Sequence, residues 1–345
     1  MDKLDFCGIE VSLRELLVAV RRHDGGQALR SFSNTPPGYQ ALIGYLSRPD
    51  RQVRICLEST GLYGLDLSLA LHAAGFELMV ANPRAVRHFA TALMKRSKTD
   101  PLDARVLLEF AARMPFQAWQ PPSAAALALR ALARRLSSLT EMQTAEKNWL
   151  HAACLTETTP AAVRRDLERS LRAHRRALDR LTREALKIIA QDPALHAGYH
   201  MLLSARGIGP TSAVQILGEV AVLAPDLNVR QWVAHAGMDP RQYTSGQSVH
   251  RKTRISKAGN RHLRRALYMP ALVAVRHDPH LRAFYQHLLA RGKAKMQALV
   301  AVMRKLLHAI FGMFKHHQPY DGSKVYRIPE SISALSKTTS PAEAA

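Results

Sequence analysis

The sequence is short of acidic residues, and this scarcity points to its partners. Its 27 Asp and Glu face 49 Lys and Arg, which gives a formal net charge of +22. Such an excess of cations favours binding to polyanions such as nucleic acids. A ribosomal or chromatin-type protein, whose charge only coats RNA or DNA, is one alternative that composition leaves open.

Cysteine and long apolar runs are also scarce. The three cysteines, Cys7, Cys56 and Cys154, are odd in number and lack metal-ligand spacing, which favours buried free thiols in a reducing compartment. No apolar run reaches about 18 residues, the length that suggests a membrane span, and residues 1–5 do not resemble a signal peptide. We therefore expect a cytoplasmic, nucleoid-associated bacterial protein with no membrane partner.

The length and the apolar content predict folded domains. The 345 residues are 47% hydrophobic, which supports real cores and leaves room for two domains with a helical connector. Antiparallel strands followed by alternating helices and strands are expected at the N-terminus, in the order β-β-β-α-β-α-β-α, which matches the RNase H-like fold. The expected strands are 5–12, 16–20, 28–32, 53–59 and 76–81, and the expected helices are 36–46 and 65–74.

Two leucine-rich stripes follow the proline pair at residues 121–122. Leucines repeat at three- and four-residue spacing over 129–150 and again over 167–188, which predicts an antiparallel helical hairpin, a coiled coil. Arginines on the second helix are either solvated or in contact with nucleic acid. Residues 196–325 are expected to form a mainly helical domain, and residues 326–345 a disordered tail.

Two glutamates close strand-like apolar runs. Glu10 ends the run 6–10 and Glu58 ends the run 53–58. Because side chains alternate along a strand, Asp5 points to the other face from Glu10 and cannot replace it. If the two strands are neighbours, the glutamates meet and need a cation such as Mg²⁺ or Mn²⁺ between them. For each glutamate taken alone, a surface charge at a strand end is the favoured interpretation.

Asp100 and Asp103 form a second acidic pair. Their spacing places both carboxylates on one face of a helix turn, beside Lys98, which adds phosphate-binding charge. The same pattern is typical of a structural helix start, with Asp100 as N-cap and Pro101 at the first helical position. The pair alone does not decide between these roles.

Residues 241–265 hold eight Lys and Arg and no acid. This strip predicts a phosphate-binding surface, whose contacts we assign to six residues. They are Arg251, Lys252, Arg254, Lys257, Arg261 and Arg264. Ser245, next to the permissive Gly246, is a candidate nucleophile for a phosphodiester, although a Ser-Gly pair also marks an ordinary turn.

A glycine-rich turn precedes this strip. Gly207 and Gly209 lie in the segment 205–213, which is typical of a helix-hairpin-helix turn that offers backbone N–H groups to a DNA phosphate. A plain connector between two helices fits the turn chemistry equally well.

Taken together, these motifs resemble the DEDD transposases of insertion sequences, a family related to pilin-gene invertases, some of whose members are guided by a bridge RNA. The resemblance covers about residues 5–315 and rests on an ordered set of short motifs. They are Gly8-Ile9-Glu10-Val11-Ser12, Leu57-Glu58-Ser59-Thr60-Gly61, Lys98-Thr99-Asp100-Pro101-Leu102-Asp103-Ala104, Gly207-Ile208-Gly209-Pro210, Ala236-Gly237-Met238-Asp239-Pro240, Ser245-Gly246 and Ile255-Ser256-Lys257-Ala258-Gly259-Asn260-Arg261.

The resemblance implies an α/β RNase H/RuvC-like N-terminal domain (1–120), an α-helical coiled-coil connector (121–195) and a mainly α C-terminal transposase domain (196–325). It also implies that four acids bind Mg²⁺ and that Ser245 links covalently to DNA. The acids are Glu10, Glu58, Asp100 and Asp103. The chain departs from the family at Glu10, where the family has Asp.

The implied function is metal-dependent DNA recombination by a homo-oligomer, a dimer or tetramer formed through the coiled coil. The implied partners are donor and target double-stranded DNA and a structured guide RNA. Two alternatives stay open: a junction-resolving nuclease that uses water in place of serine, and a nucleic-acid-binding protein without catalysis.

Overall fold

The chain forms two compact units in a computed structural model, residues Met1–Pro121 and Pro122–Ala345. The structure describes residues 3–58, 61, 63–95, 97, 99–246 and 248–328, apart from the side chains of residues 250–252. Lys98, the side chains of Arg251 and Lys252, and the predicted tail beyond residue 328 therefore lie outside what is described. The predicted division of the chain into four segments stays a prediction.

The first unit is built on a five-stranded mixed sheet of order β3-β2-β1-β4-β5. Strands β1, β2 and β3 are antiparallel neighbours, whereas β1, β4 and β5 run parallel. The predicted order of strands and helices is confirmed. The elements are β1 Lys3–Val11, β2 Glu15–Arg21, β3 Gln27–Ser33, α1 Pro36–Leu46, β4 Arg51–Glu58, α2 Leu65–Ala73, β5 Glu77–Ala81, α3 Pro83–Ala92 and α4 Asp100–Arg113.

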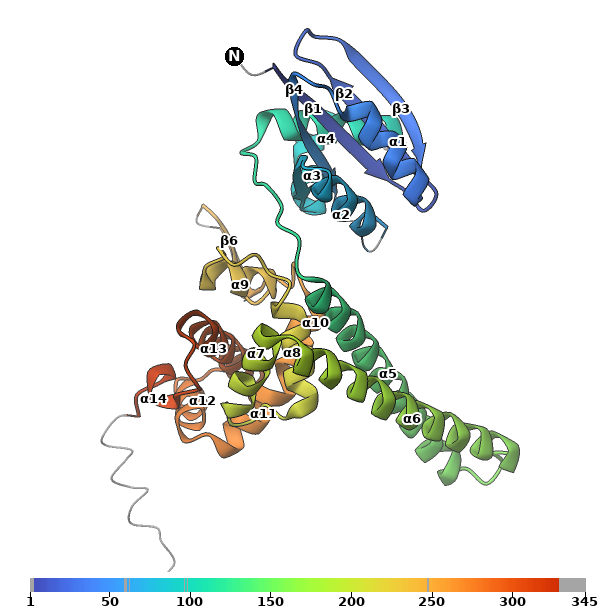
Figure 1. The fold of residues 1–345 in the computed structure, drawn as a ribbon. Helices are drawn as coiled ribbons and strands as arrows, with labels where there is room; N and C mark the ends of the chain where they lie inside the picture. The colour runs from blue at the N-terminus through green and yellow to red at the C-terminus, as the bar shows by residue number, and fades with distance from the viewer. Residues whose placement is uncertain are drawn as a thin grey trace, which may run out of the picture. The chain divides into compact units, whose positions relative to one another are not determined.

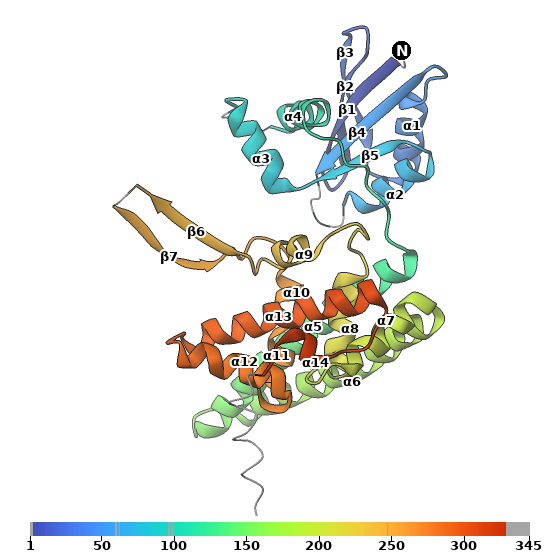
Figure 2. The same cartoon turned by 90° about the vertical axis from the view of Figure 1, so that its left-hand side faces the viewer.

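Helices cover both faces of this sheet (Figures 1 and 2), with α1 and α2 on one side and α3 and α4 on the other. The alternation of side chains along the strands explains the two layers. Cys7 and Ile9 of β1 belong to the buried cluster on the α1–α2 side, whereas Cys56 of β4 packs with Val106 and Leu107 of α4. Cys7 and Cys56 are buried free thiols, as predicted.

The second unit begins with two long helices, α5 Ala124–Leu155 and α6 Ala161–Gln191, which lie side by side as an antiparallel hairpin (Figure 1). The helical hairpin is thus observed, and its coiled-coil character stays a prediction. Leu129, Leu136 and Ile189 join the core of this unit. Farther along the hairpin, Trp149 is 60% exposed and Leu155 is 74% exposed.

Further helices and one strand pair complete this unit. The elements are α7 Pro193–Ser204, α8 Pro210–Val220, α9 Val229–His235, β6 Pro240–Ser245, β7 Val249–Ile255, α10 Arg261–Ala266, α11 Tyr268–His277, α12 Pro279–Ala290, α13 Lys295–His316 and α14 Gly322–Val325. The region is mainly helical, as predicted, but the sequence did not predict the β6–β7 hairpin, which extends away from the helices (Figure 2).

Helix α13 is long and apolar enough to cross a membrane by length and composition. It also supplies Val302, Leu306, Leu307 and Ile310 to the core of the second unit, each with an exposure of 0%. A buried core helix passes the same test of length and hydropathy. Its packing therefore accounts for its apolar composition.

Candidate active site and nucleic-acid interface

Glu10 is the second-last residue of β1, and Glu58 is the last residue of its parallel neighbour β4. The register of β1 and β4 pairs Ile9 with Leu57, and each glutamate is the next residue of its strand. Because parallel strands end at the same edge of a sheet, both carboxylates belong to the carboxyl edge of the sheet. Strands β1 and β4 are therefore neighbours, which is the condition under which Glu10 and Glu58 can meet.

Both glutamates also share the face that α4 covers. Gly8 and Cys56 precede them by two residues and so point to the same side as they do. Gly8 lies directly against the α4 backbone, and Cys56 packs with α4 side chains. Burial and, to a smaller extent, the charge of Glu58 raise the pKa of the Cys56 thiol to about 12.

Helix α4 runs antiparallel to β1 and begins near the same edge. Gly8 faces Ala104, while Arg21, the register partner of Phe6, holds Glu109 at 2.8 Å. The C-terminal half of α4 therefore lies toward the start of β1. Its first turn, with Asp100 and Asp103, lies toward the strand end that carries Glu10.

The start of α4 differs from the capping pattern expected from the sequence. Thr99, not Asp100, is the N-cap, and no side-chain hydrogen bond caps the helix. The proposed N-cap role of Asp100 is therefore wrong. Both aspartates lie in the first helical turn, where the helix dipole favours negative charge.

The candidate metal ligands at this edge are carboxylates. Within the described ranges, no three His, Cys, Asp or Glu side chains are grouped as a metal site. The donor type fits Mg²⁺, which takes carboxylate oxygens. The backbone arrangement brings the three segments that carry the four acids, β1, β4 and the start of α4, toward one edge of the sheet.

Asp5 has a structural role elsewhere on β1. Its side chain is 2% exposed and accepts a hydrogen bond from the His23 backbone N–H at 2.8 Å. Arg22 and Arg51 lie at 3.9 and 3.8 Å from its carboxylate. Asp5 therefore neutralises two arginines at the other end of the strand, in agreement with its predicted exclusion from the acid set.

Ser245 is the last residue of β6, in an exposed hairpin. All six residues of β6 are exposed, and Ser245 pairs with Val249 of β7. Gly246 follows with a φ of 55°, a conformation that favours glycine. The Ser-Gly pair therefore marks a turn, and the turn presents the serine at the end of a strand.

Ser256, by contrast, is engaged at the base of this hairpin. Its hydroxyl donates to the Asp239 carboxylate at 2.5 Å, and its N–H donates to the Asp239 carbonyl at 2.9 Å. The motif residues on either side of the hairpin thus bind each other. Of these two serines, Ser245 is the better placed to meet a DNA strand.

A buried polar network holds the segment below the hairpin, and sequence reasoning missed it. Glu219 is 1% exposed and accepts two hydrogen bonds from Arg134, at 2.7 and 2.9 Å. Asn260 donates to the same carboxylate at 2.6 Å, and its own carbonyl oxygen caps α10. The only signal in the sequence was a lone acid in the apolar helix 210–220.

The charges in this network are matched. Burial favours protonation of Glu219, but the hydrogen bonds from Arg134 and Asn260 outweigh it, so its pKa lies below the ordinary value. Burial lowers the pKa of His235, which lies 3.3 Å from the Asn260 side chain. The network therefore combines an ionised carboxylate with a neutral histidine.

The two glycines of the predicted DNA-binding turn differ in their surroundings. Gly207 has a φ of 103°, and a Cβ there would lie 2.6 Å from the Pro270 carbonyl oxygen. Gly209 is the N-cap of α8, and a Cβ there would meet nothing within 4 Å. Helix packing accounts for Gly207, whereas the backbone at Gly209 is open to a ligand.

The predicted phosphate-binding residues also differ in exposure. Arg254, Lys257 and Arg261 are exposed. Arg264 is half-buried and donates to the Ala236 carbonyl at 2.8 Å. The first three are available to a polyanion, and Arg264 has at least one structural contact.

Comparison with known proteins completes the description. One family model, named for the DEDD transposases of IS110 and described as a transposase, matches residues 7–160, and a second, described as "Transposase IS116/IS110/IS902 family", matches residues 199–286. A pilin gene-inverting protein of Moraxella bovis is 24% identical over 320 residues, which cover 92% of this chain and 97% of that protein. A putative transposase of Sinorhizobium fredii is 26% identical over 365 residues, covering 89% and 90%.

A solved structure of T. thermophilus RuvC in complex with a Holliday junction substrate is also similar, with a TM-score of 0.26 and 14% identity over 33% of this chain. The two family models carry the assignment, because together they cover more than half of the chain and agree. The chain belongs to the IS110 family of transposases.

Proposed function

We propose that this transposase cuts and rejoins DNA strands by metal-dependent phosphoryl transfer. The observation that carries the proposal is the convergence of β1, β4 and the start of α4 on one sheet edge. Glu10, Glu58, Asp100 and Asp103 would hold Mg²⁺ or Mn²⁺ there. Such an ion stabilises the charge that develops on phosphate oxygens during transfer. This assignment gives the N-terminal unit the RuvC-like role that its family resemblance implies.

Ser245 is the proposed nucleophile. Its Oγ would form a bond to the phosphorus of a DNA phosphodiester while the bond from phosphorus to one deoxyribose oxygen breaks, and the proton of the hydroxyl would pass to the leaving oxygen. The number of phosphoester bonds stays constant, so the strand can be rejoined without an external energy source. The exposed strand end and the turn at Gly246 support this role.

The proposed partners are donor and target double-stranded DNA and a structured guide RNA. The net charge of +22 and the exposed Arg254, Lys257 and Arg261 support contact with phosphates. Assembly as a dimer or tetramer through the α5–α6 hairpin is supported by the exposure of Trp149 and Leu155 on its distal half. We place the protein in the bacterial cytoplasm, at the nucleoid.

A trapping assay on a nicked or strained DNA substrate tests the nucleophile. A covalent protein–DNA adduct should form with the intact protein and with Ser256→Ala, whose serine is engaged by Asp239, but not with Ser245→Ala. Ser248→Ala provides a second control within the hairpin turn. An adduct that survives Ser245→Ala would rule out the assignment.

Chelation and Asp103→Ala test the metal. Both should abolish cleavage while DNA binding persists, because the phosphate contacts lie elsewhere. Cleavage without an adduct would instead favour a nuclease that uses water. Binding with neither adduct nor cleavage would favour a protein that only binds nucleic acid.

A further inference from the structure

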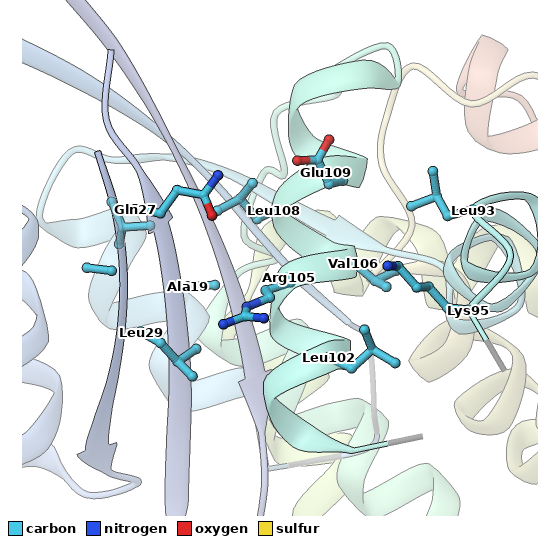
Figure 3. Close-up of a pocket in the computed structure, with 12 residues that line it drawn as sticks. Ala19, Gln27, Leu29, Leu93, Lys95, Leu102, Arg105, Val106, Leu108 and Glu109 are labelled. Carbon is cyan, nitrogen blue, oxygen red and sulfur yellow. The ribbon is translucent and has the colours of Figure 1, made fainter. Parts of the chain in front are cut away.

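A cavity lies beside α4, on the side of the sheet that carries the acids (Figure 3). It has a volume of about 280 Å³ and is formed by strands β2 and β3, the segment that follows α3, and α4 itself. Ala19, Gln27 and Leu29 line it from the strands, and Arg105 and Lys95 contribute positive charge.

Arg105 brings an uncompensated charge to this cavity. Glu109, one helical turn farther along, is its natural partner by spacing. Glu109 instead binds Arg21 at 2.8 Å and Arg113 at 2.7 Å. Among the residues that the structure describes, no carboxylate lies within ion-pair distance of Arg105.

The side chain of Arg105 extends toward Ala19 and Leu29, away from Glu109 (Figure 3). Ala19 is 3% exposed and gives that wall a small side chain, while Leu29 is 37% exposed. Strand β3 is the edge strand of the sheet, so the cavity opens beside an edge rather than into the core. A polymer backbone can therefore approach the guanidinium closely.

The electrostatics select an anion. Glu109 is the only carboxylate on the described lining, and two arginines already neutralise it. A guanidinium offers paired N–H donors that match the oxygens of a phosphate. Arg105 follows Asp103 by two residues, which places their backbones about 3 Å apart along the helix axis, while their side chains leave the helix on different sides.

We propose that this cavity binds a phosphodiester that neighbours the cut phosphodiester on the same DNA strand, with Arg105 as the positioning residue. The inference rests on the proposed function, since it takes the nearby acids as the cleavage centre. A metal centre fixes the reacting phosphate but not the direction of the strand. A second phosphate held at Arg105 sets the register of the strand across the acids, as phosphate contacts do in protein–DNA complexes.

The test compares Arg105→Gln with Arg113→Gln. Arg113 lies on the same helix and is 61% exposed, but it is paired with Glu109. Arg105→Gln should weaken DNA binding on the order of tenfold, as the loss of a charged hydrogen bond does, and reduce the salt slope of binding by about one phosphate contact. It should also broaden the positions of cleavage, whereas Arg113→Gln should leave binding and cut position unchanged.

Substitutions of Gln27 test the cavity from the opposite wall. Gln27 is exposed, so both variants should keep the melting temperature of the parent. Gln27→Lys should tighten DNA binding and Gln27→Glu should weaken it. Equal behaviour of the two Gln27 variants, or of the two arginine variants, would overturn the proposal. A parent protein that binds DNA without cutting it would overturn the proposed function instead. The salt slopes would still test the proposal at Arg105, because they are measured without cleavage.

Discussion

Gly8 of β1 lies against the backbone of α4 at Ala104. A Cβ on Gly8 would lie 2.2 Å from the carbonyl oxygen of Ala104 and 2.2 Å from the backbone nitrogen of Leu108. Real Cβ atoms do not approach backbone atoms this closely, so only glycine allows the contact. The contact fixes α4 relative to β1, which carries Glu10 near its end, and so fixes the first turn of α4, which carries Asp100 and Asp103.

Gly8→Ala should therefore destabilise the first unit by about 1–3 kcal/mol or more, the usual cost of forcing a methyl group into a packed core. It should also reduce cleavage more than DNA binding, because the aspartates move relative to Glu10. Urea unfolding and a cleavage assay measure the two effects.

Gly44→Ala is the matched control for that change. Gly44 lies inside α1, and a Cβ there would meet nothing within 4 Å. Replacing a helical glycine by alanine should stabilise the protein by about 0.5–1 kcal/mol. A Gly8→Ala protein as stable and active as the Gly44→Ala protein would show that the α4 contact has no part in placing the acids.

The buried pair of Arg134 and Glu219 yields a second prediction. Glu219→Ala would leave Arg134 with an uncompensated charge beside the core, and removing one member of a buried ion pair costs about 3–5 kcal/mol. The part-exposure of Arg134, 39%, places the expected loss at the lower end of that range. Denaturant unfolding of Glu219→Ala, compared with the exposed Glu168→Ala, measures it.

The same pair sets an acid limit on stability. Because the folded pKa of Glu219 is lowered, its contribution is fully present above the unfolded value of about 4.3 and is lost as the pH falls through the folded pKa. The second unit should therefore lose stability as the pH falls below about 4.3. In Glu219→Gln, the free energy of unfolding should depend less steeply on pH in this acidic range. The same pH dependence of unfolding in the parent and in Glu219→Gln would rule out Glu219 as the cause of the acid sensitivity.

Much of the first unit was predictable because its strands and turns carry local signals. The pair Asp24-Gly25 is typical of a tight hairpin turn, and Gly25 adopts a φ of 88° in the turn between β2 and β3. The apolar runs that end in Glu10 and Glu58 predicted β1 and β4. The sequence could not show that these strands are parallel neighbours, since pairing between segments about 48 residues apart leaves no local pattern.

The hairpin and the buried network were missed for two different reasons. The strip 241–265 has no apolar alternation, so its cations concealed the strands β6 and β7. Arg134, Glu219 and Asn260 come from distant segments, and their ordinary polar character gave no sign that they meet. Local patterns predict elements, whereas polar contacts between distant elements depend on the tertiary fold.

The exposed cations on the hairpin and just after it give a third prediction. Replacing Arg254, Lys257 and Arg261 by Gln should weaken binding to all DNA sequences and lower the salt slope by about three phosphate contacts. The matched control replaces three exposed arginines of α6: Arg165, Arg172 and Arg176. Equal losses in both proteins would show that total charge, rather than this surface, determines affinity.

Glu10 provides the last prediction, because the family resemblance implies Asp at this position. Glu10 lies near the end of β1, and the neighbouring strand β4 ends in Glu58. The sheet fixes the backbone position of Glu10. In the proposed site, the longer side chain of Glu10 would have to reach the cation from that position. A methylene group moves the carboxylate by about a bond length, and misplacement by about 1 Å can cost on the order of 100-fold in rate. Glu10→Asp should therefore raise the rate of strand cleavage and leave the affinity for DNA unchanged.

Single-turnover cleavage at saturating DNA and Mg²⁺ isolates this effect from binding. Glu10→Gln is the control, since it keeps the length of the side chain but removes its charge, and it should abolish cleavage. Glu58→Asp tests the neighbouring strand, where the family motif already has Glu, and should slow the reaction. If Glu10→Asp slows cleavage as much as Glu58→Asp does, the acid site of this chain is built around a glutamate at the end of β1, and the departure from the family is an adaptation rather than a defect.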